Sequence, residues 1–119
     1  METTPVLRKL RSLCLSLPET TERTTWGHPS FLAGKRHFVA FETVQGRPSI
    51  AFRLAQDDVA RLLGRPQFFE TPYGRGQWVS VWVDGPLDWA LVNELLRRSY
   101  RTVALKRMLA AIGRPASAS

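Results

Sequence analysis

The sequence predicts an α+β fold, a two-layer sandwich in which helices pack on a five-stranded, mainly antiparallel sheet. Apolar residues recur at helical spacing near both ends of the chain. Between them lie short runs rich in β-branched and aromatic residues, separated by turns that contain glycine or proline. These patterns give the element order α-β-β-β-α-β-β-α along the 119 residues.

A first helix is predicted to begin at Thr4, a capping residue followed by proline, and to end at Pro18. Its apolar stripe consists of Val6, Leu10, Leu13 and Leu17. The polar stretch 19–25 then leads into a turn at residues 26–29, which contains a glycine and a proline.

Three short strands are predicted at residues 30–33, 37–43 and 49–54, and the turn between the first two is basic. In the third of these strands Arg53 points away from the apolar face. A short helix over residues 56–63 follows, stopped by a glycine and a proline.

Two further strands are expected at residues 68–70 and 78–83, of which the second is the clearest in the chain. Asp88 provides a cap for a helix over residues 89–100. Residues 103–112 either continue this helix or form a separate one. The sequence thus predicts one domain over residues 1–113 and a flexible tail over 114–119.

Composition limits the class of protein. No apolar run approaches the roughly 18–20 residues that span a bilayer, and the N-terminus has no signal-like segment. The single cysteine, Cys14, forbids an internal disulfide and fits a reducing compartment. We therefore expect a cytoplasmic protein that contacts no membrane.

The chain is strongly basic. Lys and Arg number 17 against 10 Asp and Glu, which gives a net charge of +7. Such a field favours polyanionic partners, and most of the basic residues are arginines, which suit bidentate contacts to phosphate. A GC-rich genome produces the same arginine bias without any function, so charge alone leaves both interpretations open.

Short motifs follow one another in order from residue 17 to residue 107. They are Leu17-Pro18, Trp26-Gly-His-Pro-Ser-Phe31, Pro72-Tyr73-Gly74-Arg75, Trp78-Val79, Asp84-Gly85, Leu87-Asp88-Trp89, Ser99-Tyr100-Arg101, Val103-Ala104 and Lys106-Arg107. This ordered set resembles the MmcQ/YjbR family. One departure is Leu105, which stands where the family often has a proline before Lys-Arg.

The resemblance implies a fold similar to that of type III secretion chaperones, with the element order given above. It also implies a double-wing DNA-binding role, in which β-hairpins flank the contacting surface. That role is a proposal for the family as a whole, so for this chain it is an expectation.

Basic residues form the first candidate site. No acidic residue follows Glu94, and Arg97 and Arg101 share one helix face because they are four residues apart. The candidate nucleic-acid contacts on turns and on the C-terminal helix are Lys35, Arg36, Arg47, Arg75, Arg97, Arg101, Lys106 and Arg107. The alternative is a solvated surface whose C-terminal cations are stabilised by the helix dipole.

Aromatic residues form the second candidate site. Strand periodicity puts Trp78, Ser80 and Trp82 on one face of the strand and the valines on the other. The tryptophans form either an exposed strip suited to stacking or part of a core or interface. A candidate ligand or partner cleft consists of Trp26, His28, Tyr73, Trp78 and Trp82.

No catalytic site, metal site or cofactor is predicted. Cys14 lies near the apolar stripe of the first helix, where a buried role is expected. Neither histidine stands in a nucleophile motif, and no short-spaced set of metal ligands is present.

Two functions remain open at this point. The first is a DNA-binding protein, monomeric or homodimeric, that contacts phosphates through the basic residues. The second is a protein- or small-ligand-binding module that uses the aromatic cleft and has no nucleic-acid role. Salt distinguishes them, because phosphate contacts weaken with ionic strength whereas hydrophobic association survives it.

Overall fold

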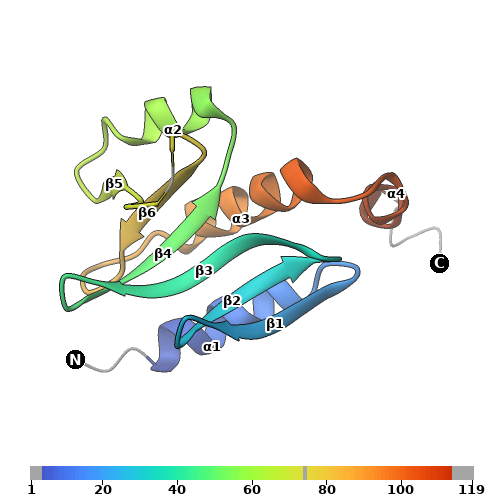
Figure 1. Cartoon of the computed structure of the whole chain (residues 1–119), viewed down its shortest axis with the longest axis horizontal. Coiled ribbons are helices and arrows are strands. Elements are labelled where there is room, and N and C mark those ends of the chain that lie inside the picture. Colours follow the sequence, from blue (N-terminus) through green and yellow to red (C-terminus); the bar gives the residue numbers. More distant parts are fainter. Residues whose placement is uncertain (1–3, 74, 114–119) are drawn as a thin grey trace.

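The computed structural model describes residues 4–73 and 75–113 and shows helices packed on one sheet (Figure 1). The helices are α1 (Thr4–Leu15), α2 (Gln56–Leu62), α3 (Trp89–Val103) and α4 (Lys106–Gly113). The strands are β1 (Thr20–Thr25), β2 (His28–Ala33), β3 (Arg36–Val44), β4 (Arg47–Arg53), β5 (Phe68–Glu70) and β6 (Trp78–Trp82). The flexible tail expected at 114–119 lies outside the described residues.

The sheet has six strands in the order β1-β2-β3-β4-β6-β5, and every neighbouring pair is antiparallel. The prediction of an α+β fold is confirmed, but the prediction of five strands is wrong. The extra strand is β1, in the stretch expected to be a polar connection. Its sequence, TTERTT, is polar on both faces and so lacks the apolar alternation that marks a half-buried strand. It forms an edge strand rich in β-branched threonine.

Among residues 4–73 and 75–113, the helices cover one face of the sheet and leave the other uncovered. In Figure 1, α1 and α3 lie behind the strands, with α1 packed against β1 and α3 against β3 and β4. Val79 and Val81 of β6 are buried on this covered face. Trp78 and Trp82 therefore lie on the opposite face, as the alternation in the sequence predicts. We call that second face the open face.

Tyr100 of α3 links three parts of the core. Its ring makes an edge-to-face contact with Phe38 of β3, with the ring centroids 5.7 Å apart. Its hydroxyl donates a hydrogen bond of 2.7 Å to the carbonyl of Pro18, just after α1. Cys14 of α1 is fully buried in the same core, and burial raises the pKa of its thiol. The expected buried role of Cys14 is confirmed.

A β-bulge near the start of β3 changes which face of the sheet each side chain takes. Ser30 and Phe31 of β2 pair with Ala40 and Val39, but Leu32 pairs with His37, which leaves Phe38 as the additional residue. Phe38 points into the core with Tyr100. On either side of the bulge, His37 and Ala40 consequently face the open side of the sheet, although they are three residues apart.

The C-terminal helices are separate. Asp88 caps α3, as predicted, by accepting a hydrogen bond of 3.2 Å from the backbone N–H of Leu91. Ala104 is extended, and α4 begins at Lys106 even though Leu105 is not a proline. Within the described part of the chain, no helix has the length and apolar character needed to cross a membrane.

Candidate functional site

A cleft of about 650 Å³ lies on the open face. Its floor contains small side chains, such as Ser30 and Ala40, so the sheet itself is hollowed there. Longer side chains from the hairpin turns and from β4 and β6 form the walls. The residues that line it are Thr25, Trp26, His28, Ser30, Lys35, Arg36, His37, Ala40, Glu42, Arg53, Tyr73 and Trp78.

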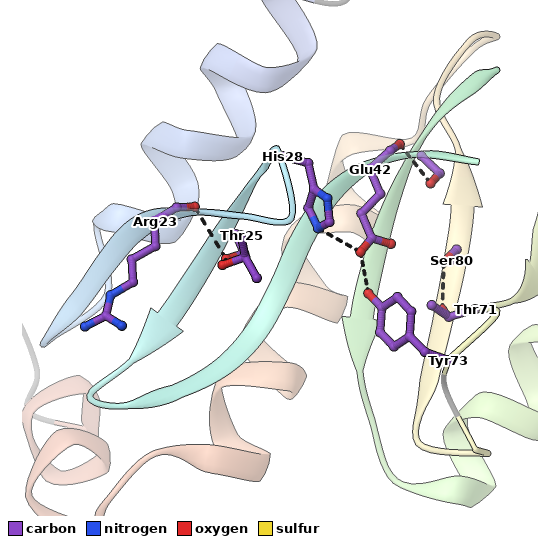
Figure 2. Close-up of polar contacts among 9 residues, drawn as sticks. Arg23, Thr25, His28, Glu42, Thr71, Tyr73 and Ser80 are labelled. Carbon is purple, nitrogen blue, oxygen red and sulfur yellow. Dashed lines mark hydrogen bonds and ion pairs between the residues drawn. The ribbon is translucent and has the colours of Figure 1, made fainter. Parts of the chain in front are cut away.

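Glu42 lies in this cleft with its carboxylate almost fully buried, the side chain being 7% exposed. One oxygen, Oε2, accepts a hydrogen bond of 2.5 Å from the hydroxyl of Tyr73 and lies 3.0 Å from Nε2 of His28. Figure 2 shows His28 and Tyr73 converging on this oxygen from different elements. The other oxygen, Oε1, is buried and has no hydrogen-bond partner among the described residues.

The polar contacts around Glu42 hold its surroundings in place. The hydroxyl of Ser49 on β4 donates to the backbone carbonyl of Glu42, and Thr71 and Ser80 share a buried hydrogen bond of 2.7 Å. Burial and the hydrogen bond to Glu42 raise the pKa of Tyr73. Tyr73 therefore stays protonated and acts as a donor to the carboxylate at any ordinary pH.

Aromatic side chains form the walls of the cleft. Tyr73 and Trp78 meet edge to face, with their ring centroids 5.8 Å apart. Trp26 is 93% exposed and occupies the two-residue turn between β1 and β2 together with Gly27. Both residues have positive φ, 54° and 83°, as a type I′ hairpin requires. A tryptophan in this backbone region is strained, and such strain tends to occur at functional positions.

Three cations surround the cleft. Lys35 lies in the β2–β3 turn, Arg36 begins β3 and Arg53 ends β4. None of the three forms an ion pair with any residue that the structure describes. Glu42 is the only acid among the described lining residues, and its carboxylate is already held by His28 and Tyr73. The rim is therefore a positive surface open to an anionic ligand.

His37 also lines the cleft. Burial, and then the nearby charges of Arg23 and His28, lower its pKa below the ordinary value of 6.5. The unfolded chain therefore binds a proton at His37 at a higher pH than the folded chain does. The contribution of His37 to stability is complete above pH 6.5 and is lost as the pH falls towards its lower folded pKa.

Replacing this histidine tests that assignment. We expect the urea midpoint of the protein to fall between pH 7 and pH 5.5, and to fall less in His37→Gln, which cannot take up the proton. Both proteins would be unfolded with urea at each pH. Equal losses in the two proteins would show that His37 does not contribute to the pH dependence.

The predicted nucleic-acid contacts separate into three groups. Lys35 and Arg36 lie in the cleft. Arg47 forms a bidentate pair with Asp84, at 2.7 and 3.0 Å, and its guanidinium lies over the ring of Trp82. Arg107 forms a bidentate pair with Glu19. In this structure, these two arginines are therefore engaged by carboxylates.

The other predicted contacts lie away from the cleft or at its edge. Arg97 and Arg101 belong to α3, in the helix layer on the covered side of the sheet. Lys106 begins α4, which packs beside the β2–β3 turn, since a Cβ at Gly34 would lie 2.9 Å from Cε of Met108. Arg75 lies in the loop before β6, exposed and with a φ of 48°. Phosphate contact by these residues stays a prediction.

The structure joins four of the five predicted cleft residues. Trp26, His28, Tyr73 and Trp78 line the same cavity. Trp82 does not line it and instead stacks on Phe69 of β5, with the ring centroids 3.9 Å apart. Trp82 is thus covered on one side by Phe69 and on the other by Arg47.

Sequence reasoning missed Glu42, His37 and Arg53 as residues of the site. The partners of Glu42 lie 14 and 31 positions away, so no local motif marks it. A signal was present nonetheless: an acid within the β-forming run 37–43 is rare in a buried strand and indicates a paired or functional carboxylate. Among the described residues no group of three His, Cys, Asp or Glu side chains is arranged to hold a metal ion.

Three solved structures share this fold. A Deinococcus radiodurans protein with a DUF419 domain is 24% identical, with a TM-score of 0.72 over 92% of this chain and 88% of that one. A Pseudomonas syringae protein is 12% identical, with a TM-score of 0.70 over 80% and 96%. A Bacillus subtilis protein of the DUF1801 family is 14% identical, with a TM-score of 0.57 over 82% and 77%. At these identities the likeness concerns the fold alone.

The sequence itself matches a family model. The model, described as YjbR, covers residues 15–102, which is most of the stretch over which the ordered motifs occur. No curated protein matches the chain.

Proposed function

We propose a function that rests on two findings. The chain belongs to the YjbR family, and its open face gathers cations that have no ion-pair partner among the described residues, together with exposed aromatic side chains. The proposed function is the binding of single-stranded nucleic acid, DNA in the first place, in the cleft. This keeps the DNA-binding role that the family resemblance implies and moves the principal contacts from the C-terminal helix to the open face of the sheet.

Phosphates are assigned to the cationic rim. Lys35 lies in the β2–β3 turn and Arg36 begins β3, and Arg53 ends the neighbouring strand β4, so all three line the cleft. Without carboxylate partners among the described residues, these cations lose no existing ion pair when a phosphate arrives. Each such contact releases counterions from the nucleic acid, which is the main source of affinity in sequence-independent binding.

Bases are assigned to the aromatic walls. Stacking on an exposed ring is a general mode of single-strand recognition because every base presents a flat face. Trp26 is the most exposed large hydrophobic residue of the described chain, and Trp78 and Tyr73 lie deeper in the same cleft. In a duplex the bases are already stacked and paired, so these rings favour a single strand.

The observation that carries the proposal is the exposed, backbone-strained Trp26 in a cleft whose three cations have no carboxylate partner among the described residues. The test is fluorescence anisotropy of a labelled single strand and of the matching duplex at several salt concentrations. We expect tighter binding of the single strand and a logarithmic salt slope of about −2, since each of three phosphate contacts contributes about 0.7. Absence of binding at low salt, or a slope near zero, would contradict the proposal.

The second candidate is a small-ligand-binding module. The volume of the cleft, about 650 Å³, lies within the range of roughly 300–1,000 Å³ that is usual for small-molecule sites. Under this alternative, oligonucleotides bind no better than a single nucleotide or fail to bind at all. The same anisotropy titration, with unlabelled mononucleotide as competitor, separates the two candidates.

A further inference from the structure

The unpartnered oxygen of Glu42 is the feature of the cleft that phosphate binding and stacking leave unused. The side chain is buried, and Oε1 accepts no hydrogen bond from any described residue. A buried acceptor without a donor is unfavourable, and a carboxylate oxygen more so than a neutral one. A ligand that brings an N–H group to Oε1 recovers this free energy.

The neighbouring contacts give that oxygen a defined direction. His28 and Tyr73 both engage Oε2, as Figure 2 shows, so rotation of the carboxylate would break two contacts at once. A donor is therefore expected to meet Oε1 rather than Oε2. The ring of Trp78 and the cation Arg53 line the same cleft, which fits a flat heterocycle carrying an anionic group.

We propose that Glu42 selects nucleobases with an exocyclic amino group, which donates a hydrogen bond to Oε1 while the base stacks in the cleft. This inference rests on the proposed function and deepens it, because it adds a base preference to sequence-independent binding. Cytosine carries such an amino group at the position where thymine and uracil carry a carbonyl. That carbonyl would face the carboxylate with two acceptors opposed, so thymine and uracil are disfavoured.

Access to Oε1 requires a side chain to move, because the oxygen is shielded in the free protein. Tyr73 is the wall residue suited to this, since it is 51% exposed. Its contacts within the cleft are the hydroxyl bond to Glu42 and the edge contact with Trp78. Rotation of Tyr73 opens the carboxylate to the incoming amino group. It gives up the Tyr73 bond to Oε2, and His28, 3.0 Å from Oε2, then keeps that oxygen engaged.

The test compares the binding of oligo-dC and oligo-dT of equal length. The two strands carry the same charge and bases of the same ring size, so they differ mainly in the groups on the base. Wild-type protein is expected to bind oligo-dC about tenfold more tightly, the effect of one hydrogen bond to a charged group. In Glu42→Gln the amide oxygen keeps the contacts to His28 and Tyr73, and the amide nitrogen replaces Oε1. A donor then stands where an acceptor stood, and the preference is expected to reverse towards oligo-dT. Equal affinities for both strands in the wild-type protein would overturn the inference.

A ligand-side control keeps the protein unchanged in case the variant folds poorly. Cytidine monophosphate is compared with its N4,N4-dimethyl derivative, which has no amino hydrogen, and with uridine monophosphate. Quenching of tryptophan fluorescence reports binding, and loss of affinity on dimethylation supports the inference. Undiminished binding of the dimethyl derivative overturns it. If cytidine monophosphate binds as tightly as the oligonucleotide, the ligand is a free nucleotide. If the oligonucleotide binds much more tightly, the ligand is a nucleic-acid strand.

Failure of this inference differs from failure of the proposed function. If both homopolymers bind with a steep salt slope and equal affinity, the cleft binds single strands and Glu42 has no selective role. If neither binds at low salt and no mononucleotide quenches the tryptophans, the proposed function fails as well. A cytosine preference that is lost or reversed in Glu42→Gln supports both the proposed strand binding and the selective role of Glu42.

Discussion

Charge reversal of Lys35 and Arg36 together is expected to weaken binding of single-stranded DNA on the order of 30-fold at low salt. Lys35 lies in the β2–β3 turn and Arg36 begins β3; both line the cleft and have no carboxylate partner among the described residues. Removal of their two phosphate contacts also lowers the magnitude of the salt slope by about 1.4, since each contact to a single strand contributes about 0.7. Anisotropy at several salt concentrations measures both effects.

The matched control is charge reversal of Arg97 and Arg101. Each double variant lowers the net charge from +7 to +3, because two cations become two anions. Arg97 and Arg101 lie on α3, in the layer that covers the other face of the sheet, so the control is expected to weaken binding only a few-fold. A larger loss in the control than in the Lys35 and Arg36 variant would assign the phosphates to the C-terminal helices instead.

The second large effect concerns stability. We expect Tyr100→Ala to lower the free energy of unfolding by about 4 kcal/mol, which is typical for truncation of a buried aromatic ring. The ring is fully buried and contacts Phe38 at the bulge. Tyr100→Phe keeps the ring and loses only the hydrogen bond to Pro18, at a cost of about 1 kcal/mol. Urea denaturation measures both variants, provided that the slope with denaturant is unchanged.

The outcome bears on the cleft as well as on the core. Phe38 is the additional residue of the bulge, and its contact with Tyr100 holds it on the covered face. A loss of less than about 1 kcal/mol in Tyr100→Ala would show that this contact does not stabilise the bulge. The placement of His37 on the open face would then need another explanation.

The strands with a clear two-residue alternation could be predicted from the sequence. In the run 78–83 the valines alternate with Trp78, Ser80 and Trp82, and the structure puts the valines on the covered face. β1 could not be recognised in this way, because its residues are polar on both faces. Its helix-facing acid, Glu22, is matched by Arg11 of α1 at 2.6 Å, a contact between two elements that no local pattern shows.

The candidate site was predicted in part for a related reason. Trp26, His28 and Tyr73 stood out because each lies in a motif that resembles the family. Their common partner Glu42 did not, because residues 14 and 31 positions away meet only when the sheet forms. The bulge in β3 changes the face that His37 takes, and the sequence of the strand carries no glycine or proline to mark it.

Two of the predicted phosphate contacts form ion pairs within the structure. Arg47 and Arg107 were expected to be available for phosphate, yet each is engaged by a distant carboxylate, 37 and 88 positions away along the chain. Counting cations along the sequence does not show these pairs. In contrast, the turn that carries Lys35 and Arg36 has no acid beside it in sequence, and none pairs with it within the described residues.

The four tryptophans offer the most direct test of the central claim, that the open-face cleft binds a single strand. Each gives one indole N–H signal in a nitrogen-correlated NMR spectrum, and the signals can be assigned by single Trp→Phe variants. Trp26 and Trp78 line the cleft, whereas Trp82 stacks on Phe69 and Trp89 lies under Lys9 of α1. Addition of a short oligo-dC is expected to shift the signals of Trp26 and Trp78 and to leave those of Trp82 and Trp89 in place. Shifts of Trp82 or Trp89 with Trp26 and Trp78 unchanged would place the nucleic acid elsewhere and contradict the account.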